Sequence, residues 1–420
     1  DTAVTLKGDT VLNTAQANGA IVLGNVVEPD AAGTHSLRLR AGTANISLDG
    51  SIGSNRHLAE LVVENTTGTT TIKGDLTASD LISLGSETTL VGDRVLTADE
   101  IDFVQGLTAD AAGQSLTLTA FTDDLDIALG GNANTDANTL DLTFGDLSRL
   151  GNTFASLIIG NATPDSNVRG DVTVAIDAGS TLTVFSPLTV YGDVVTFDSG
   201  TLATDTSKAL TFDAMGELSA TTGADVALAA GGDLTLHYRA LTTAGHLTFD
   251  RALQGVSVKL LQQGGGDLVL MEKLSGTASL SATDLANLQA TNTLTIGGTG
   301  SYPASSGASP VMTLSGTVDG APITVAEVAS NLVLDFNRIE LNNDLALDAG
   351  KSLTLRSAAG VTQAAQTTLD VDGLLLSGQG DVTLGVDNAI ATLASNTYGD
   401  ISMGVTDADM TIGTVAGVAG

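Results

Sequence analysis

Hydrophobic and polar residues alternate along most of this chain with a period of two. Such alternation places apolar side chains on one face and predicts short β-strands with one buried face. Gly, Asp, Asn or Ser residues separate most of these segments, so the pattern predicts a strand, a corner and another strand in turn. Clear examples are Ser36–Ala41 (SLRLRA), Ser115–Ala120 (SLTLTA), Asp233–Tyr238 (DLTLHY) and Ser352–Ser357 (SLTLRS).

One type of corner recurs with the same two residues. Gly-Asp followed by an aliphatic residue occurs at Gly74-Asp75-Leu76, Gly170-Asp171-Val172 and Gly380-Asp381-Val382, among other places. We expect the glycine to supply a positive φ and the aspartate to bond its own local backbone. The aliphatic residue that follows then enters the core.

Longer segments also repeat imperfectly. Glu28–Ala41 (EPDAAGTHSLRLRA) matches Thr108–Ala120 (TADAAGQSLTLTA), and Gly145–Gly160 (GDLSRLGNTFASLIIG) matches Thr283–Gly298 (TDLANLQATNTLTIGG). Imperfect repeats of this kind indicate stacked units that bury their apolar faces against their neighbours.

Short strands, polar corners and stacking together predict an all-β fold, a right-handed parallel β-helix with short polar corners and one or two projecting loops. We expect residues 1–420 to form a single continuous solenoid, in which coils of about 20 to 30 residues give roughly 14 to 21 turns. Residues 297–322 hold three of the six prolines, which predicts a projecting loop or hairpin. An antiparallel sandwich or barrel is the rival fold, but two-residue Asn-Gly or Asp-Gly hairpins are infrequent.

The composition limits which residue types can fill the core and which partners the chain can bind. Aromatic residues make up only 3% of the chain and Trp is absent, while 42% is hydrophobic, so the core must be aliphatic. The net charge of −32 would repel nucleic acids and anionic lipids, and no apolar run approaches the length of a membrane span. We therefore expect no nucleic-acid partner and no membrane insertion. The absence of Cys excludes disulfides and thiol chemistry.

The ends of the sequence suggest a piece of a longer protein. The chain starts at Asp1 without Met and stops at TIGTVAGVAG, in the middle of a repeating pattern. We expect it to be an internal fragment.

Candidate catalytic and metal-binding residues are sparse. The four histidines are scattered singly, with no second ligand at a metal-binding spacing, and no Ser matches a catalytic His and Asp. We expect no cofactor and no enzymatic activity, although calcium would suit Gly130–Asp141 and the Gly-Asp corners. The residues weighed are His35, His57, His237 and His246, together with the acid pairs Asp123 with Asp124 and Asp407 with Asp409.

A receptor-binding tripeptide is the one candidate binding site. Arg169, Gly170 and Asp171 form the Arg-Gly-Asp sequence that integrins recognise. The same residues also belong to an ordinary Gly-Asp corner that happens to follow an arginine, and this second interpretation stays open.

The segment Leu353–Gly420 carries most of a family resemblance. The Gly360–Gln363 (GVTQ) step, the Asn388–Ser402 (NAIATLASNTYGDIS) coil and the closing Thr411–Gly420 segment resemble the large Gram-negative exoproteins typified by filamentous haemagglutinin. Asp49–Ala78 resembles other coils of the same proteins. Their amino-terminal secretion domain is not recognisable in this chain.

The resemblance implies a structural or adhesive rod segment of a secreted or cell-surface exoprotein, exported through an outer-membrane secretion partner. Its expected partners are a host or neighbouring cell surface, or other copies of itself, in adhesion, biofilm or filament formation. The alternative is a carbohydrate-active β-helix, a polysaccharide lyase or hydrolase, which predicts a groove where carboxylates converge.

Overall fold

The computed structural model is nearly all β, and its parallel sheets stack as a β-solenoid of about 14 turns. It describes residues 3–65, 67–131, 139–162, 168–220, 226–238, 247–262, 268–271, 278–298, 311–314, 317–318, 321–322, 330–385, 387–406 and 409–420. The predicted fold class is therefore confirmed. The chain divides into two compact units, Asp1–Asp213 and Ala214–Gly420.

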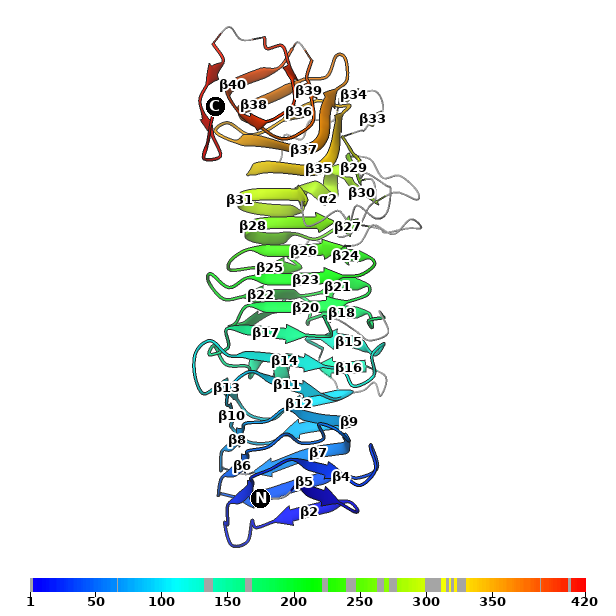
Figure 1. The fold of residues 1–420 in the computed structure, drawn as a ribbon, viewed down its shortest axis with the longest axis vertical. Helices are drawn as coiled ribbons and strands as arrows, with labels where there is room; N and C mark the ends of the chain where they lie inside the picture. Colours follow the sequence, from blue (N-terminus) through cyan, green and yellow to red (C-terminus); the bar gives the residue numbers. More distant parts are fainter. Residues whose placement is uncertain are drawn as a thin grey trace. The chain divides into compact units, whose positions relative to one another are not determined.

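The first unit consists of short strands joined by corners, with one short helix. Figure 1 shows these strands, coloured blue to green, stacked one above another along the unit. The strands are β1 (Val4–Leu6), β2 (Thr10–Asn13), β3 (Ile21–Leu23), β4 (Val27–Pro29), β5 (Leu37–Gly42), β6 (Ile46–Leu48), β7 (Leu58–Asn65), β8 (Thr70–Ile72), β9 (Leu76–Leu84), β10 (Thr88–Leu90), β11 (Arg94–Thr97), β12 (Glu100–Phe103), β13 (Leu107–Ala109), β14 (Ser115–Thr119), β15 (Asp126–Leu129), β16 (Thr139–Leu142), β17 (Ser156–Ile159), β18 (Val172–Ala175), β19 (Thr181–Val184), β20 (Leu188–Gly192), β21 (Val195–Ser199), β22 (Thr201–Thr204) and β23 (Leu210–Ala214), and the helix α1 is Phe144–Ser148.

Residues at matching positions of successive coils form columns, because the strands pair in parallel and in register. In one sheet of the first unit the strand order is β13-β10-β8-β6-β3, each strand one coil earlier in the chain than the last. An interior column runs through Leu37, Leu61, Ile82 and Ile101, none of which is more than 1% exposed. Stacked aliphatic side chains thus make up most of the core, as the low aromatic content predicted, although several phenylalanines are buried among them.

The glycines of the Gly-Asp corners are required for a reason other than the one expected. None of Gly74, Gly170 and Gly380 has a positive φ. Each lies directly against the backbone of the preceding coil, and a Cβ on Gly74 would stand 2.3 Å from the backbone nitrogen of Ser51. The corner therefore excludes a side chain because two coils approach closely there, and the expectation of a positive φ was wrong.

The aspartates of these corners hydrogen-bond the next coil and not their own turn. The backbone N–H of Val95 donates to Asp75 Oδ1 at 3.0 Å, and that of Val194 donates to Asp171 Oδ1 at 3.1 Å. Asp381 accepts in the same way from the N–H of Asp400, at 3.0 Å. The corner carboxylates thus link successive coils outside the sheets.

The Asp-Leu repeat forms a short helix that caps a strand. At α1, Asp146 and Thr143 form a capping box, and Asp146 Oδ1 also accepts the backbone N–H of Phe103 at 2.8 Å. Arg149 Nη1 donates to the carbonyl oxygen of Phe103 at 2.5 Å. The helix therefore satisfies both backbone groups that a neighbouring strand would otherwise pair. The second unit repeats this arrangement at α2 (Ala282–Ala286) with Ser281, Asp284, Asn287 and Phe249.

The second unit has longer strands, several of which continue through a corner. It also contains two antiparallel hairpins, β33 with β34 and β43 with β44. Val415 in the last hairpin packs on Leu375 and Ala394 and so covers apolar side chains outside the main core. The strands are β24 (Leu218–Ala220), β25 (Leu228–Ala229), β26 (Leu234–Tyr238), β27 (Leu247–Phe249), β28 (Leu253–Gln262), β29 (Leu268–Met271), β30 (Ala278–Ser281), β31 (Leu288–Gly297), β32 (Val311–Leu314), β33 (Thr317–Val318), β34 (Ala321–Pro322), β35 (Asn331–Leu341), β36 (Leu345–Ala346), β37 (Ser352–Gln363), β38 (Leu369–Gly378), β39 (Val382–Thr383), β40 (Ala389–Thr397), β41 (Ile401–Ser402), β42 (Thr411–Ile412), β43 (Thr414–Val415) and β44 (Val418–Ala419).

Residues 297–322, predicted as a loop or hairpin, are described only in part. Residues 299–310 lie outside the described chain. Further on, β32 pairs in parallel with β29 and β35, and β33 pairs with β34 as a hairpin. The described helices are α1 and α2, of five residues each, and in the described chain none is long and apolar enough to span a bilayer.

Candidate functional site

The Arg-Gly-Asp corner lies in the first unit just before β18. The Arg169 side chain is buried, and its Nη1 lies 2.9 Å from Asp213 Oδ1. Its guanidinium also stacks 4.9 Å from the centre of the Tyr191 ring, and its Nη2 donates to the Ala162 carbonyl oxygen at 2.7 Å. Binding of a receptor to Arg169 would require the guanidinium to leave these partners.

Asp171, in contrast, lies at the surface. Its carboxylate accepts the N–H of Val194 at 3.1 Å, and its own N–H donates to Asp126 Oδ1 at 2.9 Å. Partial desolvation, together with the charges of Asp126 and Asp193, raises the pKa of Asp171 above its ordinary value despite the bond from Val194. The three residues of the tripeptide thus occupy different environments, and its receptor role stays a prediction.

Three carboxyl groups gather elsewhere in the first unit, on β12 and β16. Desolvation of Glu100 and the negative charge of Asp102 raise the pKa of Glu100 to about 8, although the backbone N–H of Asp141 bonds its carboxylate. The Oε1 atom of Glu100 is buried without a hydrogen-bond partner, and Asp141 is only 8% exposed. Glu100 therefore carries a proton at neutral pH beside two other carboxyl groups.

A carboxyl group whose pKa is raised in this way by burial and by neighbouring carboxyl groups has the chemistry of a general acid. Within the described residues, however, no group of three His, Asp or Glu side chains is placed to hold a metal ion, this cluster included. The alternative of calcium at Gly130–Asp141 is not tested, because residues 132–138 lie outside the described chain.

The remaining residues weighed from the sequence are not brought together. His35 Nε2 lies 2.9 Å from Asp30 Oδ1, and the His57 ring packs on Phe121 with centroids 4.3 Å apart. Asp123, Asp124 and Asp409 are exposed. His237 is half-buried in β26, while His246 and Asp407 lie outside the described residues.

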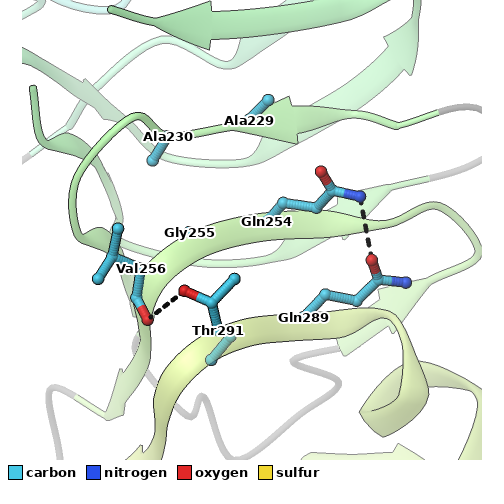
Figure 2. A pocket seen from close by; sticks show the side chains of 8 residues that line it. Ala229, Ala230, Gln254, Gly255, Val256, Gln289 and Thr291 are labelled. Atoms are coloured by element: carbon cyan, nitrogen blue, oxygen red, sulfur yellow. Dashed lines mark hydrogen bonds between the residues drawn. The ribbon is translucent and has the colours of Figure 1, made fainter. Parts of the chain in front are cut away.

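An open groove lies on the second unit where β25, β28 and β31 run side by side (Figure 2). It has a volume of about 360 Å³, at the lower end of the range for small-ligand sites. Ala229, Gln254 and Gln289 occupy one column across the three strands, and Gln254 Nε2 donates to Gln289 Oε1 at 3.0 Å. Beside them lie Val256 and Thr291, whose Oγ1 is 3.5 Å from the Val256 carbonyl oxygen.

The groove forms because β28 and β31 bend at the same place. Their register shifts between Gly255 and Ser257, directly after the pair Gly255 and Ala290. Both residues are small and buried, so no bulky side chain occupies the inner side of the bend.

Sequence reasoning missed both the acidic cluster and the groove. Asp141 reaches Glu100 only because β16 follows β15 in the chain yet contacts β12, and no local pattern reveals that order. The sequence does contain a pattern that indicates the groove. Leu253-Gln254-Gly255 and Leu288-Gln289-Ala290 repeat a Leu-Gln-small motif, which aligns the two glutamines once the coils are stacked.

Comparisons with known proteins identify no relative of the chain. No protein-family model, curated protein or solved structure matches it.

Proposed function

We propose that this chain is a structural and adhesive segment of a secreted or cell-surface bacterial exoprotein. The observation that carries the proposal is the repetition of one element: parallel coils, aliphatic columns and aspartate links between coils. Such a fold extends by adding coils and offers a long surface for contacts. The same properties suit a spacer or a scaffold for adhesive contacts.

The sequence resemblance to filamentous-haemagglutinin-like exoproteins supports an extracellular location and export through an outer-membrane partner. The absence of Cys and the net charge of −32 suit a protein that must remain soluble without cross-linking. The partners we propose are a host or neighbouring cell surface, or further copies of the chain.

Adhesion can be measured with beads that carry the purified chain. We expect coated beads to bind cultured host cells or bacterial cells, or to bind each other, more than beads coated with an unrelated acidic protein. Equal binding by both bead types would refute the adhesive role. Asp171→Glu tests the tripeptide separately, because this change keeps the charge but alters an integrin-type ligand.

The second candidate is a carbohydrate-active β-helix, and the cluster of Glu100, Asp102 and Asp141 is the observation that favours it. Glycosidases pair a protonated carboxylic acid with an ionised carboxylate. Incubation with acidic and neutral polysaccharides, followed by assay of new reducing ends, tests this function. Product that forms with the native chain and not with Glu100→Gln would support it, while no product from any polysaccharide would exclude it for that panel.

A further inference from the structure

We infer that the groove over β25, β28 and β31 binds a neutral oligosaccharide. The inference rests on the proposed adhesive function, for which it supplies a ligand class. It is carried by the lining of the groove in Figure 2, where amide and hydroxyl groups stand beside small apolar side chains.

The absence of charged residues around the groove indicates the chemical class of its ligand. None of the described residues that line the groove is charged, although the chain holds 48 acidic and 16 basic residues. An anionic ligand would find no cation there and would be repelled by the net charge of −32. A cationic ligand would find no carboxylate to pair with. A neutral, polar ligand is the class that this lining complements.

The hydrogen-bonding groups suit hydroxyls. Gln254 Nε2 donates to Gln289 Oε1. The side-chain oxygen Oε1 of Gln254 is then left as an acceptor, and the side-chain nitrogen Nε2 of Gln289 is left as a donor. A sugar hydroxyl both donates and accepts, so a pair of hydroxyls can bond both amides. The Thr291 hydroxyl, which donates to the Val256 carbonyl oxygen and can still accept a bond, adds a third polar group to the lining.

The floor of the groove suits the apolar face of a sugar ring. Ala229 and Ala230 lie next to Gln254, and the Val256 side chain is 44% exposed. These small groups leave a shallow open space across three coils, which favours an extended chain of sugars over an enclosed small molecule. At the groove β28 lies between β25 and β31 and pairs with both, so this strand offers no free edge to an added peptide strand.

The test uses the purified chain and a panel of soluble oligosaccharides. The neutral members are fragments of β-glucan, α-mannan and β-galactan, and the anionic members are fragments of polygalacturonate and hyaluronate. We expect at least one neutral fragment to bind in calorimetry, and the double variant Gln254→Ala/Gln289→Ala to bind it at least tenfold more weakly. Gln379→Ala is the matched control, because Gln379 is an exposed glutamine of the same unit outside the groove.

A second variant fills the groove instead of removing its polar groups. Ala229→Leu adds a side chain in the column of Gln254, and binding should fall while the circular dichroism spectrum and melting temperature stay unchanged. Binding of no neutral fragment, preference for an anionic fragment, or equal affinity in the double variant would overturn the inference. Adhesion without glycan binding would leave the proposed function standing, and glycan binding without adhesion would refute the adhesive role alone.

Discussion

At the scale of single residues, the Gly-Asp corners make the fold most sensitive to substitution. Gly74→Ala would place a Cβ 2.3 Å from the backbone nitrogen of Ser51, and no side-chain rotation relieves that contact. We expect a loss of about 1–3 kcal/mol in the free energy of unfolding, as for other overpacked sites. Urea unfolding measures it. Gly24→Ala is the control, since a Cβ there meets nothing within 4 Å, and an equal loss in both variants would contradict the close-approach explanation.

Glu100 gives the chain a pH-dependent stability. Its pKa is about 8 in the folded chain against an ordinary value of 4.5, so the unfolded chain releases the proton first as the pH rises. The stability that protonated Glu100 contributes is therefore full below pH 4.5 and is lost as the pH rises through about 8. Glu100→Gln removes this loss, and we expect the variant to gain stability relative to the native chain between about pH 5 and about pH 9.

Urea midpoints measured across this range test the prediction. Glu87→Gln is the matched control, because it removes an exposed carboxylate of the same unit. If the two variants follow the same pH profile, the acidic cluster is not the cause.

The residue scale also shows what sequence could predict. The inward orientation of Leu37 and Leu61, which form one column, could be predicted because the local alternation of apolar and polar residues shows which face of a strand is buried. The role of Asp75 could not be predicted, because its partner is the N–H of Val95 in the next coil. The contact between Glu100 and Asp141 could not be predicted for the same reason, because it depends on the order in which the coils stack.

At the scale of elements, the sequence identified the Asp-Leu repeat but not its structure. Gly145–Gly160 and Thr283–Gly298 were matched as repeats, and both contain a short helix followed by a strand. Five-residue helices carry too little periodicity to be recognised. Their signal was the capping box, in which Thr143 or Ser281 precedes an Asp by three residues.

Parallel, in-register coils predict that one whole coil can be removed. Leu76 pairs with Ile52 and with Leu96, so deletion of residues 76–95 joins Asp75 to Leu96 and keeps the column. The deletion also brings Glu60 beside Glu100, and we therefore place it in the Glu100→Gln background. We expect a folded β protein with cooperative unfolding, measured by circular dichroism.

The control deletion removes half as much chain but breaks the register. Deletion of residues 76–85 takes away β9 alone and leaves β10 without the strand that should precede it. We expect that variant to lose cooperative unfolding. A shorter deletion that is better tolerated than the whole coil would contradict the stacked-column arrangement.

At the scale of the whole molecule, the net charge of −32 on 420 residues opposes compaction. Salt screens this repulsion, since the Debye length falls from about 20 Å or more at low salt to a few ångströms near 1 M. We therefore expect the urea midpoint to rise as NaCl increases from about 0.02 M to about 0.5 M. A midpoint that is independent of NaCl would show that the acidic residues are too dispersed for their repulsion to matter.

Calcium distinguishes screening from specific binding on the same chain. No group of three acidic or histidine side chains in the described parts is placed to hold a metal ion, so calcium should act there by ionic strength. We expect CaCl₂ and MgCl₂ at equal ionic strength to raise the urea midpoint by the same amount. Any difference between MgCl₂ and NaCl measures the stronger screening by divalent ions. A rise with micromolar CaCl₂ that MgCl₂ does not reproduce would instead require a calcium site, because ionic strength is negligible at that concentration.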